Sequence, residues 1–373
     1  MTALPSSTLP AGVRARIVTD TNGLDMHLLE AGHEEPGRPV VLLLHGFPEI
    51  AYSWRKVMPA LAAAGYRVLA PDQRGYGRTT GWDPDYDGDL ASYRFLNLVR
   101  DVMCLLKALD VAQVAAVVGH DFGATVAGYA ALLRPDIFRS LVLMSAPFAG
   151  APPLAASPRG GDIHAALAAL PRPRKHYQWY YSTREANANM WRAPQGVHDF
   201  LRAYYHHKSA DWKANTPFPL KGWTADELAK MPTYYIMDLA EGMAETVARE
   251  MPSRAEIANN KWLPDSELRI YSEEYDRTGF QGGLQWYRIR TSGLFDAELE
   301  LLSGRTIDQP ATFMAGASDW GIHQSPGAIE RMANQTCTRM TGVHLIDGAG
   351  HWVQQERPDE VNRLLLAFLG AVA

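Results

Sequence analysis

Three polar residues follow apolar runs of the chain in an order that could support nucleophilic catalysis. Asp121 lies in G-H-D-F-G, Asp319 in A-S-D-W-G and His351 in D-G-A-G-H-W. A carboxylate is already anionic at neutral pH, so Asp121 could attack a saturated electrophilic carbon directly and form an alkyl ester. His351, oriented by Asp319, would then activate the water that hydrolyses this ester.

Each of these residues also has an ordinary structural interpretation. Asp121 could simply cap the helix that follows it, since Asp is common at helix N-termini. Asp319 could be a surface carboxylate, and His351 is one of 12 histidines. Two glycines flank the H-D-F segment, however, and such a pattern is typical of the sharp strand-to-helix turn that presents a nucleophile. The order nucleophile, acid, base is that expected for an α/β-hydrolase triad.

The elements that must position these residues are strands and helices in alternation. Asn22-Gly23 supplies a tight turn between two N-terminal strand patterns. Alternation of strands and helices then predicts a mostly parallel sheet covered on both faces, with ligands bound beyond the carboxyl ends of the strands. The predicted strands are 39–44, 66–70, 114–118, 140–145, 310–316 and 341–346, and the predicted helices are about 54–64, 91–109, the segment after Phe122, and 358–372.

The alternation stops from about Ala149 to Gly304, where helical patterns and aromatic residues dominate and no convincing buried strand is seen. We therefore expect a core formed by residues 1–148 and 305–373, interrupted by a helical cap at 149–304. Such a cap would lie over the strand ends.

Composition excludes several classes of protein. The 373 residues carry a formal net charge of −5, whereas nucleic-acid binding requires a basic surface. No stretch approaches the roughly 18 apolar residues of a membrane span, and no secretory signal is recognisable. Cys104 and Cys337 are too few for a disulfide framework and too isolated for a metal site. We expect a reduced, cytoplasmic setting without nucleic acid or membrane partners; the sequence leaves a homodimer open.

Several motifs together resemble the epoxide hydrolase branch of the α/β-hydrolase superfamily. They are H-G-F-P-E, S-W, D-Q-R-G-Y-G, G-H-D-F-G and G-H-W-V-Q-Q-E-R-P, and the likeness covers roughly residues 35–148 and 308–370. The resemblance implies an α/β-hydrolase core with a helical lid, and no metal or organic cofactor. It implies that Asp121 is the nucleophile and that the backbone N–H groups of Phe47 and Phe122 form an oxyanion hole.

Opening an epoxide produces an alkoxide, which needs a proton donor. A phenol is neutral at pH 7 yet more acidic than an alcohol. The resemblance implies two lid tyrosines for this purpose. The segment G-G-L-Q-W-Y-R-I-R points to Tyr287, and K-H-Y-Q-W-Y-Y-S points to Tyr177, with Tyr180 and Tyr181 as alternatives.

Two other functions compete with this one. Haloalkane dehalogenases usually carry Trp after the nucleophile to hold the halide, but this chain has Phe122, and the arginine pair of haloacetate dehalogenases is missing beside Asp121. A catalytically inactive, lid-gated receptor would not need His351 as a base. The sequence therefore predicts an enzyme that converts an apolar epoxide and water to a vicinal diol.

Overall fold

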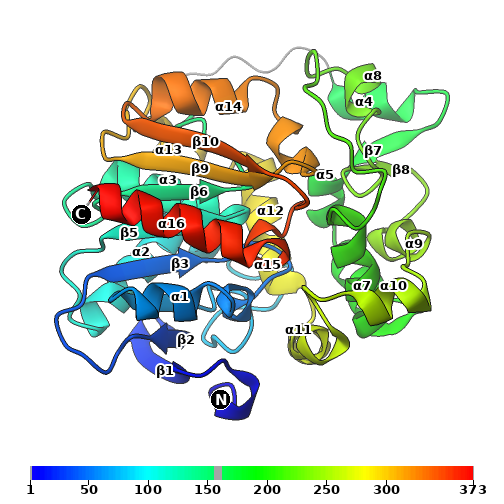
Figure 1. Ribbon diagram of the computed structural model, residues 1–373. Helices are drawn as coiled ribbons and strands as arrows, with labels where there is room; N and C mark the ends of the chain where they lie inside the picture. Colours follow the sequence, from blue (N-terminus) through cyan, green and yellow to red (C-terminus); the bar gives the residue numbers. More distant parts are fainter. Residues whose placement is uncertain (1, 155–161, 373) are drawn as a thin grey trace.

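The computed structural model describes residues 2–154 and 162–372 (Figure 1). Its centre is an eight-stranded sheet with the strand order β1-β2-β4-β3-β5-β6-β9-β10. The β1–β2 and β2–β4 pairs are antiparallel and the remaining pairs are parallel. The strands are β1 (Val13–Thr21), β2 (Leu24–Ala31), β3 (Val40–Leu44), β4 (Arg67–Pro71), β5 (Ala116–His120), β6 (Leu141–Met144), β9 (Ala311–Gly316) and β10 (Met340–Ile346).

Hydrophobicity and turn chemistry explain these strands. Every residue of β3, β5, β6 and β9 is buried, as expected for parallel strands covered on both faces. Asn22 and Gly23 both have positive φ, which matches the right-handed twist of the β1–β2 hairpin. The predicted parallel sheet and its N-terminal hairpin are confirmed.

Helices cover both faces of this sheet. Helices α1 and α16 pack on one face, while α2 and α3 pack together on the other (Figure 1). The α-helices of this part are α1 (Met58–Ala63), α2 (Phe95–Ala108), α3 (Phe122–Leu133), α14 (Ala328–Arg331), α15 (Val353–Glu356) and α16 (Pro358–Val372). Its short turns are η1 (Ser6–Thr8), η2 (Ala51–Trp54), η3 (Leu90–Tyr93), η4 (Trp320–His323) and η5 (Met332–Thr336), the last a π-helix.

The segment between β6 and β9 forms a mostly helical insertion, drawn in green and yellow in Figure 1. The expectation that it lacks strands is wrong in one detail, because β7 and β8 pair antiparallel. Each has three residues, too few to show an alternating pattern. The elements are α4 (Ile163–Ala168), β7 (Arg174–His176), α5 (Tyr177–Tyr181), α6 (Glu185–Trp191), α7 (Gly196–Lys208), α8 (Ala225–Leu228), β8 (Ile236–Asp238), α9 (Met243–Ala248), α10 (Arg254–Asn259), α11 (Asp265–Thr278), α12 (Gln281–Ser292) and α13 (Asp296–Glu300).

One hydrophobic cluster runs from the α2–α3 face of the sheet into the insertion without a break. It includes Phe122 and Tyr129 of the core together with Tyr177, Phe200 and Tyr287 of the insertion. Across the described residues, no helix combines the length and apolar character that a membrane crossing requires.

Candidate active site

Asp121 lies at a sharp turn between the end of β5 and the start of α3. Its φ of 52° and ψ of −119° are unfavourable for a residue with a side chain. Two glycines permit this turn. A Cβ on Gly46 would come within 2.6 Å of Asp121 Oδ1, and a Cβ on Gly123 would overlap the carbonyl group of Leu44. The turn therefore places the Asp121 side chain just beyond the end of β5.

The Asp121 carboxylate is directed at the loop after β3. Its Oδ1 accepts a 3.1 Å hydrogen bond from the backbone N–H of Phe47, and its side chain makes no capping bond to α3. The helix-capping interpretation of Asp121 is therefore wrong. Burial would raise its pKa, but His351, Lys208 and His120 outweigh burial and hold the pKa of this carboxyl well below its usual range. The carboxylate is thus anionic, and its side chain remains 14% exposed.

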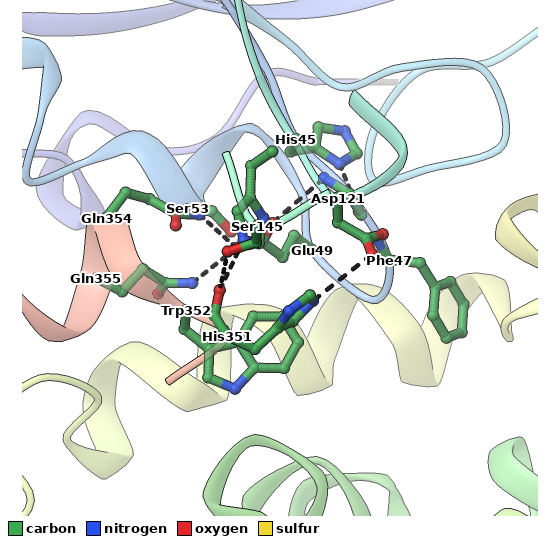
Figure 2. Close-up of polar contacts among 12 residues, drawn as sticks. His45, Phe47, Glu49, Ser53, Asp121, Ser145, His351, Trp352, Gln354 and Gln355 are labelled. Atoms are coloured by element: carbon green, nitrogen blue, oxygen red, sulfur yellow. Dashed lines mark hydrogen bonds and ion pairs between the residues drawn. The ribbon is translucent and has the colours of Figure 1, made fainter. Parts of the chain in front are cut away.

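His351 lies between the carboxylates of Asp121 and Asp319, and Figure 2 shows its contact with Asp121. Its Nδ1 is 3.1 Å from Asp319 Oδ2 and 3.2 Å from Oδ1. A carboxylate accepts hydrogen bonds and does not donate them, so Nδ1 donates its proton to Asp319 and Nε2 faces Asp121. Nε2 lies 3.6 Å from Asp121 Oδ2, which is too long for a hydrogen bond, and it has no hydrogen-bond partner among the described residues.

The carbonyl oxygen of His351 is held from the core side. It accepts hydrogen bonds from His120 Nε2 at 2.7 Å and from Ser145 Oγ at 3.0 Å. The other ring nitrogen of His120 lies 2.6 Å from Glu49 Oε2. Because both neighbours of His120 are acceptors, both ring nitrogens must carry protons, and Glu49 raises the pKa of His120 against the effect of burial. His120 is therefore a buried imidazolium adjacent to Asp121.

Glu49 has enough partners to stay ionised although it is buried. Gln354 and Gln355 each donate to Oε1 at 2.9 Å, and Gly46 N–H donates to Oε2 at 3.2 Å (Figure 2). Burial opposes ionisation, but His120, His45 and the N–H group of Gly46 lower the pKa of Glu49 to about 2.

The loop that carries His351 is also bonded to the insertion. Glu356 Oε2 accepts from Gly350 N–H at 3.0 Å and from Ala210 N–H at 2.8 Å, while Oε1 accepts from Trp352 N–H at 3.0 Å. A single partly buried carboxyl group thus joins the backbone on both sides of His351 to the segment that follows α7, and burial raises the pKa of this group to about 8.

Tyr287 and Tyr177 approach the nucleophile from the insertion. The Tyr287 ring packs edge-on against Phe122 and Phe47, with ring centroids 4.6 Å and 5.4 Å apart. Its centroid lies 5.8 Å from that of the Tyr177 ring. Burial raises the pKa of both phenols, and the charge of Asp121 contributes to each shift. Both phenols are therefore neutral at pH 7 and sense the charge of the nucleophile.

The two alternative tyrosines have other neighbours. The Tyr181 hydroxyl donates to Tyr204 Oη at 3.2 Å, and the Tyr180 ring lies 4.4 Å from the ammonium group of Lys175. The Asp121 charge is not among the main influences on either phenol.

The structure thus brings together every predicted site residue: Asp121, Asp319, His351, Phe47, Phe122, Tyr177 and Tyr287. Sequence reasoning missed the groups around them. Glu49, His120 and Glu356 lie in the motifs quoted above, and their positions near the ends of predicted strands could have indicated a role in the site. Lys208 carried no signal, because its surroundings come from segments far apart in the sequence.

Comparison with known proteins agrees with this geometry. Residues 39–358 match the α/β-hydrolase fold family. The chain is 35% identical to epoxide hydrolase B of Mycobacterium tuberculosis, with 95% of this chain and 98% of that protein covered. It is 31% identical to an epoxide hydrolase of Caballeronia sordidicola, covering 98% and 97%.

Solved structures of epoxide hydrolases are similar over nearly their whole length. An epoxide hydrolase from an endophytic Streptomyces has a TM-score of 0.73 and 33% identity, covering 97% of each chain. Potato (Solanum tuberosum) epoxide hydrolase I has a TM-score of 0.72 and 29% identity, covering 96% of this chain and 99% of that one. The chain therefore belongs to the epoxide hydrolases of the α/β-hydrolase superfamily.

Proposed function

We propose that this epoxide hydrolase converts an apolar epoxide and water to a vicinal diol through an ester on Asp121. A carboxylate oxygen of Asp121 attacks one carbon of the ring, a C–O bond forms, and the ring C–O bond breaks. The electron pair of that bond stays on the ring oxygen, which takes a proton from Tyr177 or Tyr287. The product of this step is a hydroxyalkyl ester of Asp121.

Water completes the cycle. His351 Nε2 takes a proton from a water molecule, and the resulting hydroxide attacks the carbonyl carbon of the ester. The N–H groups of Phe47 and Phe122 stabilise the oxyanion, and Asp319 stabilises the imidazolium. Collapse of the intermediate breaks the ester bond, and the leaving alkoxide takes the proton of the His351 imidazolium to complete the diol. The proton of the restored Asp121 carboxyl group passes to the tyrosinate, which returns every group to its starting state.

One observation carries this proposal. His351 Nε2 lies 3.6 Å from Asp121 Oδ2 and has no hydrogen-bond partner among the described residues. A base placed beside Asp121 but not bonded to it suits the activation of water at an ester. The 3.1 Å bond from Phe47 N–H to Asp121 Oδ1 supports the oxyanion role in the same way.

The apolar substrate class is supported by the rings around Asp121. The Tyr287 ring packs edge-on against both Phe47 and Phe122, and these rings offer apolar carbon surface beside the carboxylate. We further propose that residues 149–304 act as a cap domain, because this segment supplies both tyrosines.

A single turnover in oxygen-18 water tests the ester. Excess enzyme is reacted with styrene oxide, and the peptide that contains Asp121 is analysed by mass spectrometry. Label in Asp121 is expected, because water attacks the ester carbonyl and one labelled oxygen stays on the enzyme. Label in the diol alone would show direct attack of water on the epoxide and would contradict the proposal.

The His351→Ala variant tests the base. We expect it to form the ester once and then to stop, so that the intact mass of the enzyme rises by the mass of styrene oxide. His33→Ala, which removes a histidine from the loop after β2, is the matched control and should turn over normally. Steady turnover by His351→Ala would assign the base to another group.

A further inference from the structure

A lysine is buried inside the cap close to the catalytic groups. Lys208 is the last residue of α7 and is 3% exposed. Its Nζ lies over four aromatic rings, 4.9 Å from the centroid of Tyr235, 5.3 Å from Trp352, 5.4 Å from Tyr204 and 5.9 Å from Tyr234. Ring faces attract a desolvated cation, so this aromatic cage holds the ammonium group in place.

The Lys208 amino group is not directly paired with a carboxylate. Within residues 2–154 and 162–372, Asp121, Asp319 and Glu49 influence it through space, and no ion pair or hydrogen bond joins Nζ to an acceptor. Burial lowers the pKa of Lys208, and the charges of Asp121, Asp319 and Glu49 oppose that shift. Because no ion pair cancels its charge, the ammonium group acts on these carboxylates across a low-dielectric interior.

The charge on Asp121 changes twice in the proposed cycle. It is −1 in the free enzyme, zero in the ester, and −1 again when hydroxide has added to the ester carbonyl. A fixed positive charge nearby stabilises the first and third states but not the ester. It therefore speeds hydrolysis of the ester and does not favour its formation.

We propose that Lys208 is a positioning residue whose caged charge favours the anionic states of Asp121 and so selectively accelerates ester hydrolysis. This inference rests on the proposed function. Recognition of a substrate carboxylate is the competing role, and the charges oppose it. Asp121, Asp319 and Glu49 contribute three negative charges against the two positive charges of Lys208 and His120, so the site already has an excess of negative charge.

The test separates the two chemical steps. Lys208→Met keeps the apolar stem and removes the charge, whereas Lys208→Arg keeps the charge. Lys213→Met, which removes an exposed cation from the loop after α7, is the matched control. Ester formation and hydrolysis of styrene oxide are measured by rapid quench and intact mass, with the ester located on Asp121.

We expect Lys208→Met to hydrolyse the ester at least about tenfold more slowly, a change of roughly 1.4 kcal/mol, while ester formation is unchanged or faster. The ester should therefore accumulate, Lys208→Arg should recover most of the hydrolysis rate, and Lys213→Met should behave as wild type. Equal slowing of both steps would indicate a structural role and overturn the proposal, as would an unchanged hydrolysis rate.

The ratio of the two rate constants reports only on the enzyme molecules that are folded. A preparation in which only some of the molecules are folded therefore still gives this ratio. If Lys208→Met gives no folded protein, Lys208→Gln replaces it. Absence of an Asp121 ester in the wild-type enzyme would instead contradict the proposed function itself, before any variant is compared.

Discussion

The backbone N–H of His351 donates to the carbonyl oxygen of Lys208 over 2.9 Å, so the candidate base is bonded directly to the last residue of cap helix α7. The end of helix α7 therefore helps to fix the position of the core loop that carries His351. Trp352 strengthens this junction, because its Nε1–H donates to the carbonyl oxygen of Tyr205 at 2.9 Å. Movement of α7 away from the core would displace the base as well as the cap.

Glu356 offers a direct test of this junction. Glu356→Gln replaces one carboxyl oxygen by an amide N–H₂ group, which cannot accept a hydrogen bond. At least one of the backbone N–H groups that donate to Glu356 therefore loses its acceptor. We expect the free energy of unfolding to fall by about 1–3 kcal/mol and kcat to fall with it. Chemical denaturation and steady-state kinetics measure both changes.

Glu360→Gln is the matched control, because the Glu360 side chain on α16 is 42% exposed and bonds only Arg363 among the described residues. Solvent screens such a pair, so the variant should unfold at nearly the wild-type denaturant concentration. If Glu356→Gln were as mild as this control, the junction would not depend on the carboxylate.

Phenylalanine substitutions should distinguish the candidate proton donors. Tyr177→Phe and Tyr287→Phe each remove a hydroxyl and keep the ring, so ester formation should slow, and the double variant should slow it by about 10² or more. Rapid-quench measurement of ester formation gives the effect. Tyr180→Phe is the control and should leave that rate unchanged. A strong loss in Tyr180→Phe with normal Tyr177→Phe would move the donor to Tyr180.

Gly46 should tolerate no side chain. A Cβ there would come within 2.6 Å of Asp121 Oδ1 and 2.8 Å of Cγ, so Gly46→Ala must displace the nucleophile. Because a displacement of about 1 Å can cost about 10² in rate, turnover should fall by at least that factor. Gly222→Ala is the control, since a Cβ at Gly222 meets nothing within 4 Å. Normal kcat/KM in Gly46→Ala would contradict the observed contact.

The sequence was sufficient for the strands and for the residues that end them. Continuous apolar runs such as 39–44 and 310–316 are typical of parallel strands covered on both faces, and Asp121 and Asp319 follow strands of this kind. His351 follows β10, in which every second residue is exposed. The predicted helix 54–64 was too long, because the structure has a 3₁₀ turn at Ala51–Trp54 and begins α1 at Met58. Pro59 in the first turn favours a helix start there.

The contacts between distant segments could not be predicted. Lys208 meets Trp352, and Glu356 meets Ala210, across about 145 positions of the chain. Their side chains do not follow apolar strands in the sequence and show no periodic pattern. Only the folded arrangement of cap and core reveals what surrounds them.

Low pH and high pH should both weaken the Glu49–His120 pair, because low pH protonates Glu49 and high pH removes a proton from His120. The lowered pKa of Glu49 gives a stability that is complete above about pH 4.5 and is lost as the pH falls toward about 2. The raised pKa of His120 gives a stability that is complete below about pH 6.5 and is lost as the pH rises through the raised value. The pair therefore stabilises the fold most between these limits.

Glu49→Gln tests this window. Removing one partner of a buried pair costs about 3–5 kcal/mol, and the difference from wild type should be largest between about pH 4.5 and 6.5. Urea denaturation across the pH range measures it. Glu34→Gln, at an exposed carboxylate, should give a small difference at every pH. A constant difference for Glu49→Gln would show that the two charges are not linked.

The attachment of the insertion has a consequence for how this enzyme can diversify. The chain leaves the core after β6 and re-enters it at β9, and these two strands pair directly with Leu141 opposite Ala311. The register of this strand pair thus sets the separation of the two junctions, whatever lies between them. Doubling the length of a flexible connection costs only about 0.6 kcal/mol in the entropy of loop closure. Loops of the insertion that do not carry Tyr177, Tyr287 or Lys208 can therefore lengthen while the residues at the strand ends keep their places.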